Sequence, residues 1–352
     1  MSREPAGLVR DRSFVVRGGG VSIRIDRRAI VVAASLIVVI VALALWGLTL
    51  GSFELSIPEV VQVLLGGGDG PARKVVLEWR GPRILAAIVF GCLLGISGAI
   101  FQSLTRNPLG SPDIIGFNAG SYTGVVVMLM LGISGYAATV TAALVGGLVT
   151  AAIIYFLAFR DGMSGMRLIL VGIAISAFLG GLNQWFTVKA GVDEALRAAV
   201  WGAGTLSLAD TTSVAFGSIA LVAVIAVLPL AQQRMRRLEL GDDTAAALGV
   251  PVEGTKAMLV VLGVVTTAVV TATAGPIAFV ALAAPQIGRR LRGRGTSVDV
   301  TSAALVGAVV LLASDLVAQH AFPHLLLPVG AVTVCVGGLY LLWLLIVEGR
   351  RK

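Results

Sequence analysis

Residues 30–50 read IVVAASLIVVIVALALWGLTL, an apolar run without a charged side chain. An α-helix needs about 20 apolar residues to cross the hydrocarbon core of a bilayer, so this run predicts a membrane span. Arg27 and Arg28 precede it, but it is longer than the roughly 7–15 residues of a signal-peptide core, and no A-x-A cleavage pattern follows. We therefore expect a retained first span, with residues 1–29 forming an Arg-rich cytoplasmic tail of low order.

The composition of the whole chain agrees with a membrane protein. Of its 352 residues, 57% are hydrophobic and only 13% are charged, and the mean hydropathy is +0.95. A soluble protein carries about 25% charged residues because its surface faces water. The net charge of +8 could suggest binding to nucleic acid, but Lys and Arg also accumulate on the cytoplasmic side of membrane proteins. We expect a lipid-embedded protein that binds no nucleic acid.

The same hydropathy argument predicts ten spans in a single domain over residues 30–352. They lie near 30–50, 84–104, 114–131, 136–157, 168–187, 212–232, 257–274, 277–288, 301–319 and 328–347. The eighth is too short to cross alone, and Gly275-Pro276 breaks the backbone at its start. We expect a bent or half-length helix there, entering protein interior. The predicted class is an all-α integral membrane protein with about ten transmembrane helices.

The distribution of positive charge tests this topology, because ten spans place both termini on one side. That side then holds all but six of the 27 Lys and Arg residues; the six are Arg73, Lys74, Arg80, Arg83, Lys189 and Arg197. One span more or fewer would mix the two groups. The charge asymmetry therefore predicts that both termini are cytoplasmic.

Several functional classes lack their usual residues. Asp315 is the one carboxylate well inside a predicted span, whereas ion-coupled carriers need several such groups; we expect Asp315 to be a structural hydrogen-bond partner. The sequence holds only two histidines, His320 and His324, and no cluster that could serve a membrane enzyme or a metal ion. Residues 249–257 have the glycine spacing of a phosphate-binding loop but continue Thr-Lys-Ala instead of Lys-Ser or Lys-Thr. Any ATP would have to bind to another chain.

Four blocks carry a more specific signal. The first runs from Arg80-Gly-Pro-Arg83 through Gly98-Ala-Ile-Phe-Gln102 and Arg106-Asn-Pro-Leu-Gly-Ser-Pro-Asp113 to Ile115-Gly-Phe-Asn-Ala-Gly120. The others are Gly241-Asp-Asp-Thr-Ala-Ala-Ala-Leu-Gly-Val250, Gly275-Pro-Ile-Ala-Phe-Val-Ala-Leu-Ala-Ala-Pro285, and Leu327-Pro-Val-Gly330 with Gly337-Gly-Leu-Tyr340. Together they resemble the FecCD-type permeases of binding-protein-dependent importers for ferric siderophores, haem and cobalamin. Within that family, the chain is most similar to the G-type subunit of ferric-enterobactin importers.

The resemblance implies a type II ABC importer permease fold and assigns roles to particular residues. It implies that Arg80 and Arg83 receive acidic residues of an extracytoplasmic binding protein, with interfacial snorkelling as the alternative. The loop at about 233–256 would carry the coupling helix that contacts an ATPase, through Asp242, Asp243, Thr244, Ala245, Ala246, Leu248 and Gly249. The cytoplasmic gate would be Met163, Ser164, Gly165 and Met166, although a plain short turn would also fit. The translocation path would be lined by Gln102, Asn107 and Asn118.

The same resemblance implies a set of partners. The chain would be a permease subunit in the cytoplasmic (inner) membrane that translocates a ferric siderophore and performs no bond chemistry. It would bind no cofactor, since ATP and magnesium would bind to two partner ATPase subunits. A paralogous permease would complete a heterodimer, with a homodimer as the alternative, and a binding protein would deliver the siderophore. Cobalamin or haem import remains an alternative within the family, and ion-coupled secondary transport an alternative outside it.

Overall fold

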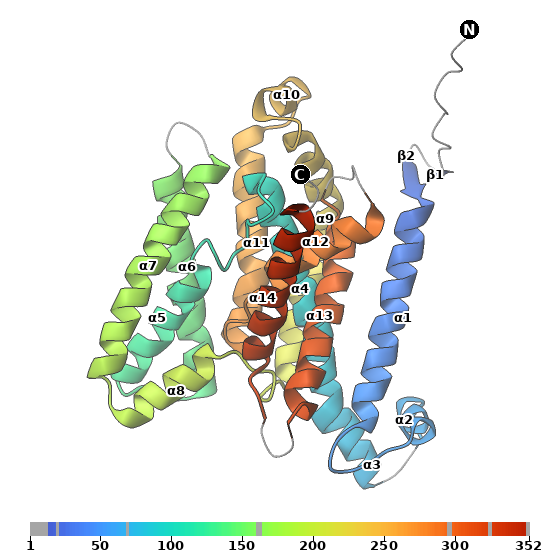
Figure 1. Ribbon diagram of the computed structural model, residues 1–352, viewed down its shortest axis with the longest axis vertical. Helices are drawn as coiled ribbons and strands as arrows, with labels where there is room; N and C mark the ends of the chain where they lie inside the picture. Colours follow the sequence, from blue (N-terminus) through green and yellow to red (C-terminus); the bar gives the residue numbers. More distant parts are fainter. Residues whose placement is uncertain are drawn as a thin grey trace.

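The computed structural model describes residues 13–18, 21–67, 70–159, 164–293, 298–322 and 326–349. The described chain is almost entirely helical (Figure 1). Its elements are β1 (Ser13–Gly18), β2 (Val21–Asp26), α1 (Arg27–Thr49), α2 (Ile57–Leu64), α3 (Pro71–Lys74), the π-helix η1 (Val75–Arg80), α4 (Gly81–Thr105), α5 (Phe117–Met130), α6 (Tyr136–Ala158), α7 (Gly165–Lys189), α8 (Val192–Gly202), α9 (Thr211–Leu238), α10 (Asp242–Ala247), α11 (Val252–Ala274), α12 (Val280–Arg292), α13 (Val300–His320) and α14 (Val329–Gly349).

A helix lies at each of the ten predicted spans. Seven of them are long and apolar enough to cross a membrane, namely α1, the continuous helix α3–η1–α4 over Pro71–Thr105, α6, α7, α9, α11 and α13. Helix α5 and the apolar part of α14 are shorter. The eighth span is the half-length helix α12, which has 13 residues and begins after Phe279, whose φ is +69°. The prediction of an all-α membrane fold with one broken span is confirmed.

The N-terminal segment is the exception to the helical pattern. Low order was expected there, but β1 and β2 form an antiparallel hairpin that pairs Phe14 with Ile25 and Val16 with Ile23. The physical reason is local. Three β-branched residues alternate with polar residues over residues 21–26, two more precede the Gly-rich turn sequence at residues 18–20, and such residues favour strands. Helix α1 follows directly and begins at Arg27.

Helix α4 forms the centre of the molecule. In the most apolar 18-residue stretch of the Pro71–Thr105 helix, 78% of the residues are buried. Helix α4 contacts α9, α11, α12 and α13. Glycines permit this close approach: a Cβ atom added to Gly91 would lie 2.5 Å from the Gly307 carbonyl oxygen, and one added to Gly98 would lie 1.7 Å from that of Ala281. Small residues of this kind let helix backbones approach each other in lipid, where no hydrophobic force draws helices together.

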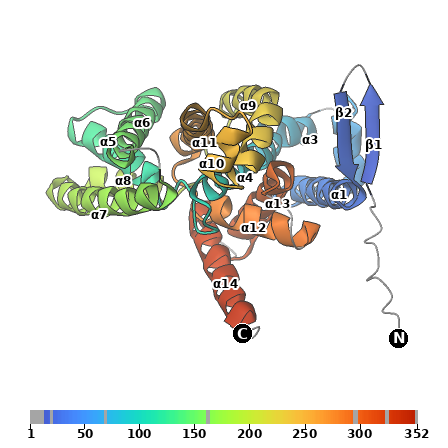
Figure 2. The ribbon, with the colours of Figure 1, turned by 90° about the horizontal axis from the view of Figure 1, so that it is seen from above.

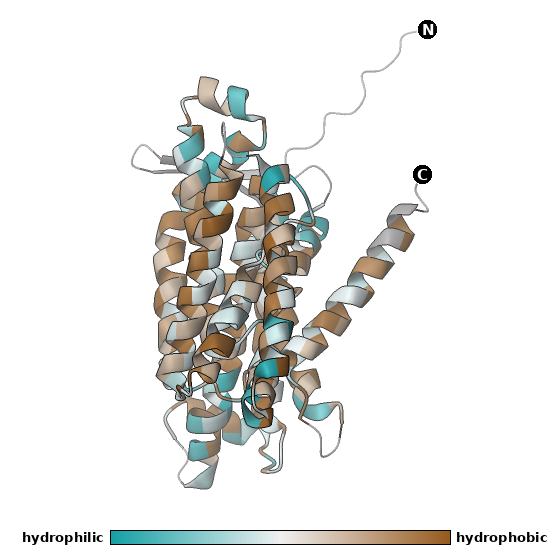
Figure 3. Cartoon of the chain, turned by 90° about the vertical axis from the view of Figure 1, so that its left-hand side faces the viewer, coloured by the Kyte–Doolittle hydropathy of each residue, from teal (hydrophilic) through white to brown (hydrophobic). Residues whose placement is uncertain are grey.

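Helices α5–α8 form a second group beside this central bundle (Figures 1 and 2). Helices α5 and α6 pack closely through Gly120, Gly124 and Gly146, and α11 joins the group to the centre by contacting both. Hydrophilic residues concentrate near the two ends of the molecule, whereas the helix bodies are mainly hydrophobic (Figure 3). Large apolar side chains on α1, α6, α7 and α9 are exposed. These faces suit lipid or another membrane subunit.

Candidate functional site

Helix α10 projects from the end of the molecule, in the loop between α9 and α11 (Figure 1). Its C-terminus is closed by hydrogen bonds from Gly249 N to Ala246 O (2.9 Å) and from Val250 N to Ala245 O (3.0 Å). This is a Schellman motif, which requires the positive φ of +77° that Gly249 adopts. The loop predicted from sequence therefore contains a short helix with a defined end.

The predicted coupling residues divide into an inner and an outer set. Ala245 is fully buried and holds α10 against the bundle. The outer set is exposed and consists of Asp243, Thr244, Ala246, Leu248 and Gly249. Leu248 is 53% exposed although it is a large apolar residue. A small-residue surface with one projecting leucine can enter a groove of a partner.

Asp242 ties the start of α10 to the membrane helices. Its carboxylate accepts a hydrogen bond from Arg106 Nη2 (2.5 Å) and another from Lys256 Nζ (2.7 Å). Arg106 follows the last residue of α4, and Lys256 lies in the first turns of α11. Partial burial raises the pKa of Asp242, but the hydrogen bonds and positive charges of Lys256 and Arg106 more than offset it, so the pKa is below its ordinary value.

Three of the four predicted gate residues can be placed. Ser164 precedes α7, and Gly165 and Met166 form its first turn, while Met163 lies outside the described residues. A Cβ atom on Gly165 would lie 2.6 Å from the Cα of Thr105, so this segment packs directly on the end of α4. Met166 is 61% exposed. A gating role for these residues stays a prediction.

The structure brings together two of the three predicted path residues. Gln102 and Asn107 line one cavity of about 250 Å³ near the α10 end of α4. Gln102 donates through Nε2 to the carbonyl of Leu282 in α12 (2.9 Å), and its buried Oε1 has no partner among the described residues. Asn118 lies apart from them and donates to Asp113 (2.7 Å).

Asp113 was not singled out by the sequence analysis, although it ends a quoted motif. Its two oxygens accept hydrogen bonds from Asn118 Nδ2 (2.7 Å) and from the backbone N–H of Phe279 (3.2 Å). In α12 itself, Gln286 donates a hydrogen bond from Nε2 to the carbonyl of Pro108 (2.8 Å). The irregular segment after α4 is thus fixed to the broken entry of α12. No sequence signal reported this pairing, because the partners are far apart along the chain.

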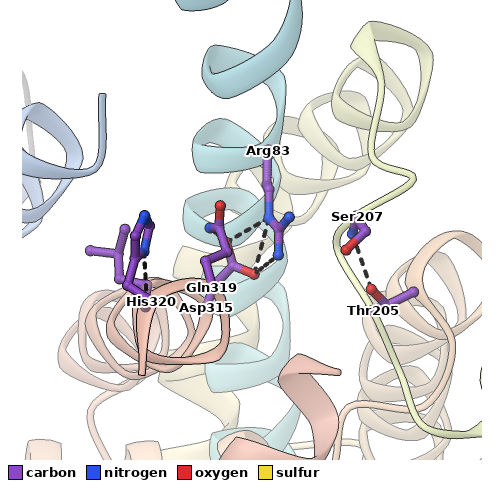
Figure 4. Close-up of polar contacts among 7 residues, drawn as sticks. Arg83, Thr205, Ser207, Asp315, Gln319 and His320 are labelled. Carbon is purple, nitrogen blue, oxygen red and sulfur yellow. Dashed lines mark hydrogen bonds and ion pairs between the residues drawn. The ribbon is translucent and has the colours of Figure 1, made fainter. Parts of the chain in front are cut away.

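At the opposite end of the molecule, the two predicted docking arginines already have partners within the chain. Arg80 donates from Nη1 to Leu48 O and from Nη2 to Phe53 O, both at 2.7 Å. Arg83 binds Asp315 through Nε (2.9 Å) and Nη2 (2.8 Å), as Figure 4 shows. The role of Asp315 as a structural hydrogen-bond partner is confirmed. Docking of a binding protein on either arginine stays a prediction.

The Asp315 cluster is almost closed to water. The Asp315 side chain is 0% exposed, and the Arg83 side chain is 16% exposed. Gln319, one turn further along α13, donates to the second carboxylate oxygen (2.8 Å). Arg83 Nη1 makes no hydrogen bond to a described residue and is not among the buried unpartnered atoms. The Nη1 nitrogen of this guanidinium is therefore accessible to solvent.

Within the described part of the chain, no group of three or more His, Cys, Asp or Glu residues lies close enough together to hold a metal ion.

Comparison with known proteins gives consistent matches over almost the whole chain. The model of the FecCD transport family matches residues 36–347. The chain is 44% identical over 330 residues to the ferric enterobactin transport system permease protein FepG of Escherichia coli K12, covering 94% of this chain and 100% of FepG. It is 30% identical to the iron(3+)-hydroxamate import system permease protein FhuG of Bacillus subtilis 168, covering 91% of this chain and 97% of FhuG.

A solved structure gives the same answer for the fold. A metal-chelate type ABC transporter in an inward-facing conformation superposes with a TM-score of 0.80 at 25% identity, covering 90% of this chain and 99% of that one. The arrangement of helices is therefore that of an ABC transporter permease.

Proposed function

Because the chain belongs to the FecCD transport family, we propose that it is the permease subunit of an ATP-driven importer that carries ferric siderophores across the cytoplasmic membrane. The observation that carries the proposal is the 44% identity to FepG over the full length of that protein. Sequence identity of this degree over 94% of this chain and the full length of FepG supports the proposal that this chain and FepG carry the same class of substrate. The FhuG match, to an importer of another iron chelate, supports the same class.

The proposed energy source is ATP bound with magnesium on two separate ATPase subunits. The support is the exposed outer face of α10, where Leu248 is 53% exposed, together with the likeness to an ABC transporter. Movement of α10 by the ATPases would alternate access to a path through the permease pair. This chain would bind no nucleotide and perform no bond chemistry.

The remaining subunits are proposed from the resemblance to the G-type subunit. A paralogous permease would cover part of the exposed apolar surface, forming a heterodimer, and a homodimer is the competing arrangement. Coexpression of this chain with its paralogue, followed by native mass spectrometry, distinguishes the two. The proposed orientation, with both termini cytoplasmic, follows from the charge asymmetry, and reporter fusions at each terminus test it.

The binding protein is proposed to dock at the end of the molecule that carries Arg80 and Arg83. In this arrangement a partner carboxylate could bind the solvent-accessible Nη1 of Arg83 and the remaining N–H groups of Arg80. The double variant Arg83→Gln, Asp315→Asn keeps a neutral hydrogen-bonded pair and removes the guanidinium. We expect slower association of the binding protein with nanodisc-held permease and a weaker salt dependence. An unchanged association rate and salt slope would exclude Arg83 from docking.

The function itself is tested by uptake into proteoliposomes that contain the whole importer. Ferric enterobactin with radiolabelled iron is supplied with the binding protein, with and without internal ATP. We expect uptake that requires ATP and persists when an ionophore removes ion gradients. Uptake that the ionophore abolishes would identify an ion-coupled carrier, and a preference for cobalamin or haem in a competition assay would identify another substrate of the family.

A further inference from the structure

We propose that the C-terminal end of α4, formed by Thr105 and the following residue Arg106, is a mechanical link. It would transmit a displacement of α10 to residues 164–166, which we call the gate segment. The inference rests on the proposed function, since it concerns how the proposed importer would couple ATP to gating. Three features of the structure carry it: an ion pair, a backbone contact and an intervening cavity.

The ion pair connects α10 to α4. Arg106 Nη2 donates both to Asp242 Oδ1 (2.5 Å) and to the carbonyl of Leu238 (2.7 Å). One nitrogen atom therefore holds the last residue of α9 and the first residue of α10. Lys256 binds the second oxygen of Asp242 at 2.7 Å. The start of α10 cannot move unless the end of α4 follows or these charge-assisted bonds break.

The backbone contact connects α4 to the gate segment. A Cβ atom on Gly165 would lie 2.6 Å from Thr105 Cα and 2.9 Å from Thr105 O. No flexible side chain stands between the two backbones, so a shift of Thr105 displaces Gly165 directly. Closely packed interfaces of this kind respond by discrete rearrangement and not by continuous deformation.

The cavity shows why the link passes through α4. It has a volume of about 470 Å³ and is lined by Asp242 and Lys256 as well as by Gly165 and Met166. Space therefore lies between α10 and the gate segment, into which either could move. Thr105 and Arg106 are consecutive, and Arg106 adopts a left-handed φ of +50° that turns the chain sharply after α4. Adjacent residues thus contact the two moving parts on either side of the cavity.

The test uses the complete importer in proteoliposomes with the single variants Arg106→Gln and Gly165→Ala. We expect the ATPase to co-purify and hydrolyse ATP as in the wild type, while iron uptake per ATP falls about tenfold. Arg106→Lys keeps the positive charge and should recover part of the loss. Gly254→Ala is the matched control, because an added Cβ there has no atom within 4 Å, and we expect normal uptake per ATP.

A double-mutant cycle separates a shared link from two unrelated defects. If both contacts belong to one link, the combined variant should be no worse than the more severe single variant. Losses that multiply in the double variant, or wild-type uptake per ATP in both single variants, would overturn the proposal.

A distance measurement tests the link without depending on which substrate the importer carries. Spin labels at Leu240→Cys, just before α10, and at Met166→Cys, in a Cys92→Ala, Cys335→Ala background, report the separation of the start of α10 and the gate segment. We expect an ATP-dependent change that Arg106→Gln abolishes. If the complex shows this change but takes up no ferric siderophore, the proposed substrate fails and the link stands. No change in the parent protein, or the same change with Arg106→Gln, overturns the link.

Discussion

Two carboxylates at opposite ends of the molecule are held in similar ways but in different surroundings. Asp315 is fully buried and binds Arg83 and Gln319, joining α13 to the central helix α4. Asp242 is 42% exposed and binds Arg106 and Lys256, joining the peripheral helix α10 to α4 and α11. Both therefore connect another element to α4, one at each end.

Because the two clusters differ in exposure to water, we expect them to differ in their contribution to stability. Removing one partner of a buried ion pair leaves a charge without solvent, which is strongly destabilising. An exposed pair is weakened by water and salt and contributes little to stability. The Asp315 cluster is therefore suited to fixing two core helices, and the Asp242 cluster to holding a part that moves.

The largest expected effect is at the buried cluster. Arg83→Met leaves the Asp315 charge with only Gln319, and we expect a loss of about 3–5 kcal/mol in the free energy of unfolding. Thermal unfolding of the purified protein and its abundance in the membrane measure this. The double variant Arg83→Met, Asp315→Leu should recover most of the loss. A single variant that loses less than about 1 kcal/mol would contradict the assignment of this pair as structural.

A smaller effect is expected at the exposed cluster. Asp242→Ala removes the shorter carboxylate contact of the buried Lys256 but leaves Glu253 at 3.6 Å. We expect a loss of about 1–2 kcal/mol in stability and a larger loss in transport. Unfolding and uptake measured on the same preparation compare the two. A stability loss equal to that of Arg83→Met would remove the distinction between the clusters.

On the outer face of α10, we expect a functional effect with almost no change in stability. Leu248→Asp adds a charge at a position that is already 53% exposed, so stability should change by less than about 0.5 kcal/mol. Co-purification of the ATPase and iron uptake should both be lost. Leu65→Asp, at an exposed leucine after α2, is the control and should bind the ATPase normally. Normal co-purification with Leu248→Asp would exclude this face from coupling.

The smallest effect is a pH dependence of the Asp242 cluster. Because the pKa of Asp242 is lowered in the folded protein, its stabilisation is complete above the unfolded pKa of about 4 and is lost as the pH falls through the lower folded value. The group is partly exposed, so we expect only about 0.5 kcal/mol. The stability difference between wild type and Asp242→Asn should shrink below about pH 4. A difference that is constant from pH 6 to pH 3 would contradict the shift.

Much of the fold and part of the candidate site could be predicted from the sequence. Hydropathy located the ten helices that lie at the predicted spans, and Gly275-Pro276 located the broken one. The resemblance carried by residues 241–250 located the short helix α10 in the loop between α9 and α11. The N-terminal hairpin was not predicted, because its many arginines indicate low order, although three β-branched residues alternate with polar ones over residues 21–26.

These successes share a physical cause, and so do the omissions. The thickness of the bilayer, the conformational limits of proline and glycine, and the cost of unpaired backbone groups in lipid all act within about 20 consecutive residues. The sequence alone therefore determines how many helices are expected to span the membrane and roughly where each one lies. Contacts between helices depend on which faces meet, and a 3.6-residue period in an almost uniformly apolar helix does not report this.

Tertiary structure alone decided the partners of the polar residues. Arg83 and Asp315, which form an ion pair, are 232 residues apart in the sequence. Thr271 donates a hydrogen bond to Asn118, and these two residues are 153 residues apart. Nothing in the sequence distinguished the paired Arg83 from an arginine free to dock, or placed Asn118 away from Gln102 and Asn107. The close approach of helix backbones at glycines such as Gly91 and Gly98 sets these distances, because in a close-packed bundle the position of each polar group is fixed by the packing of the helix that carries it.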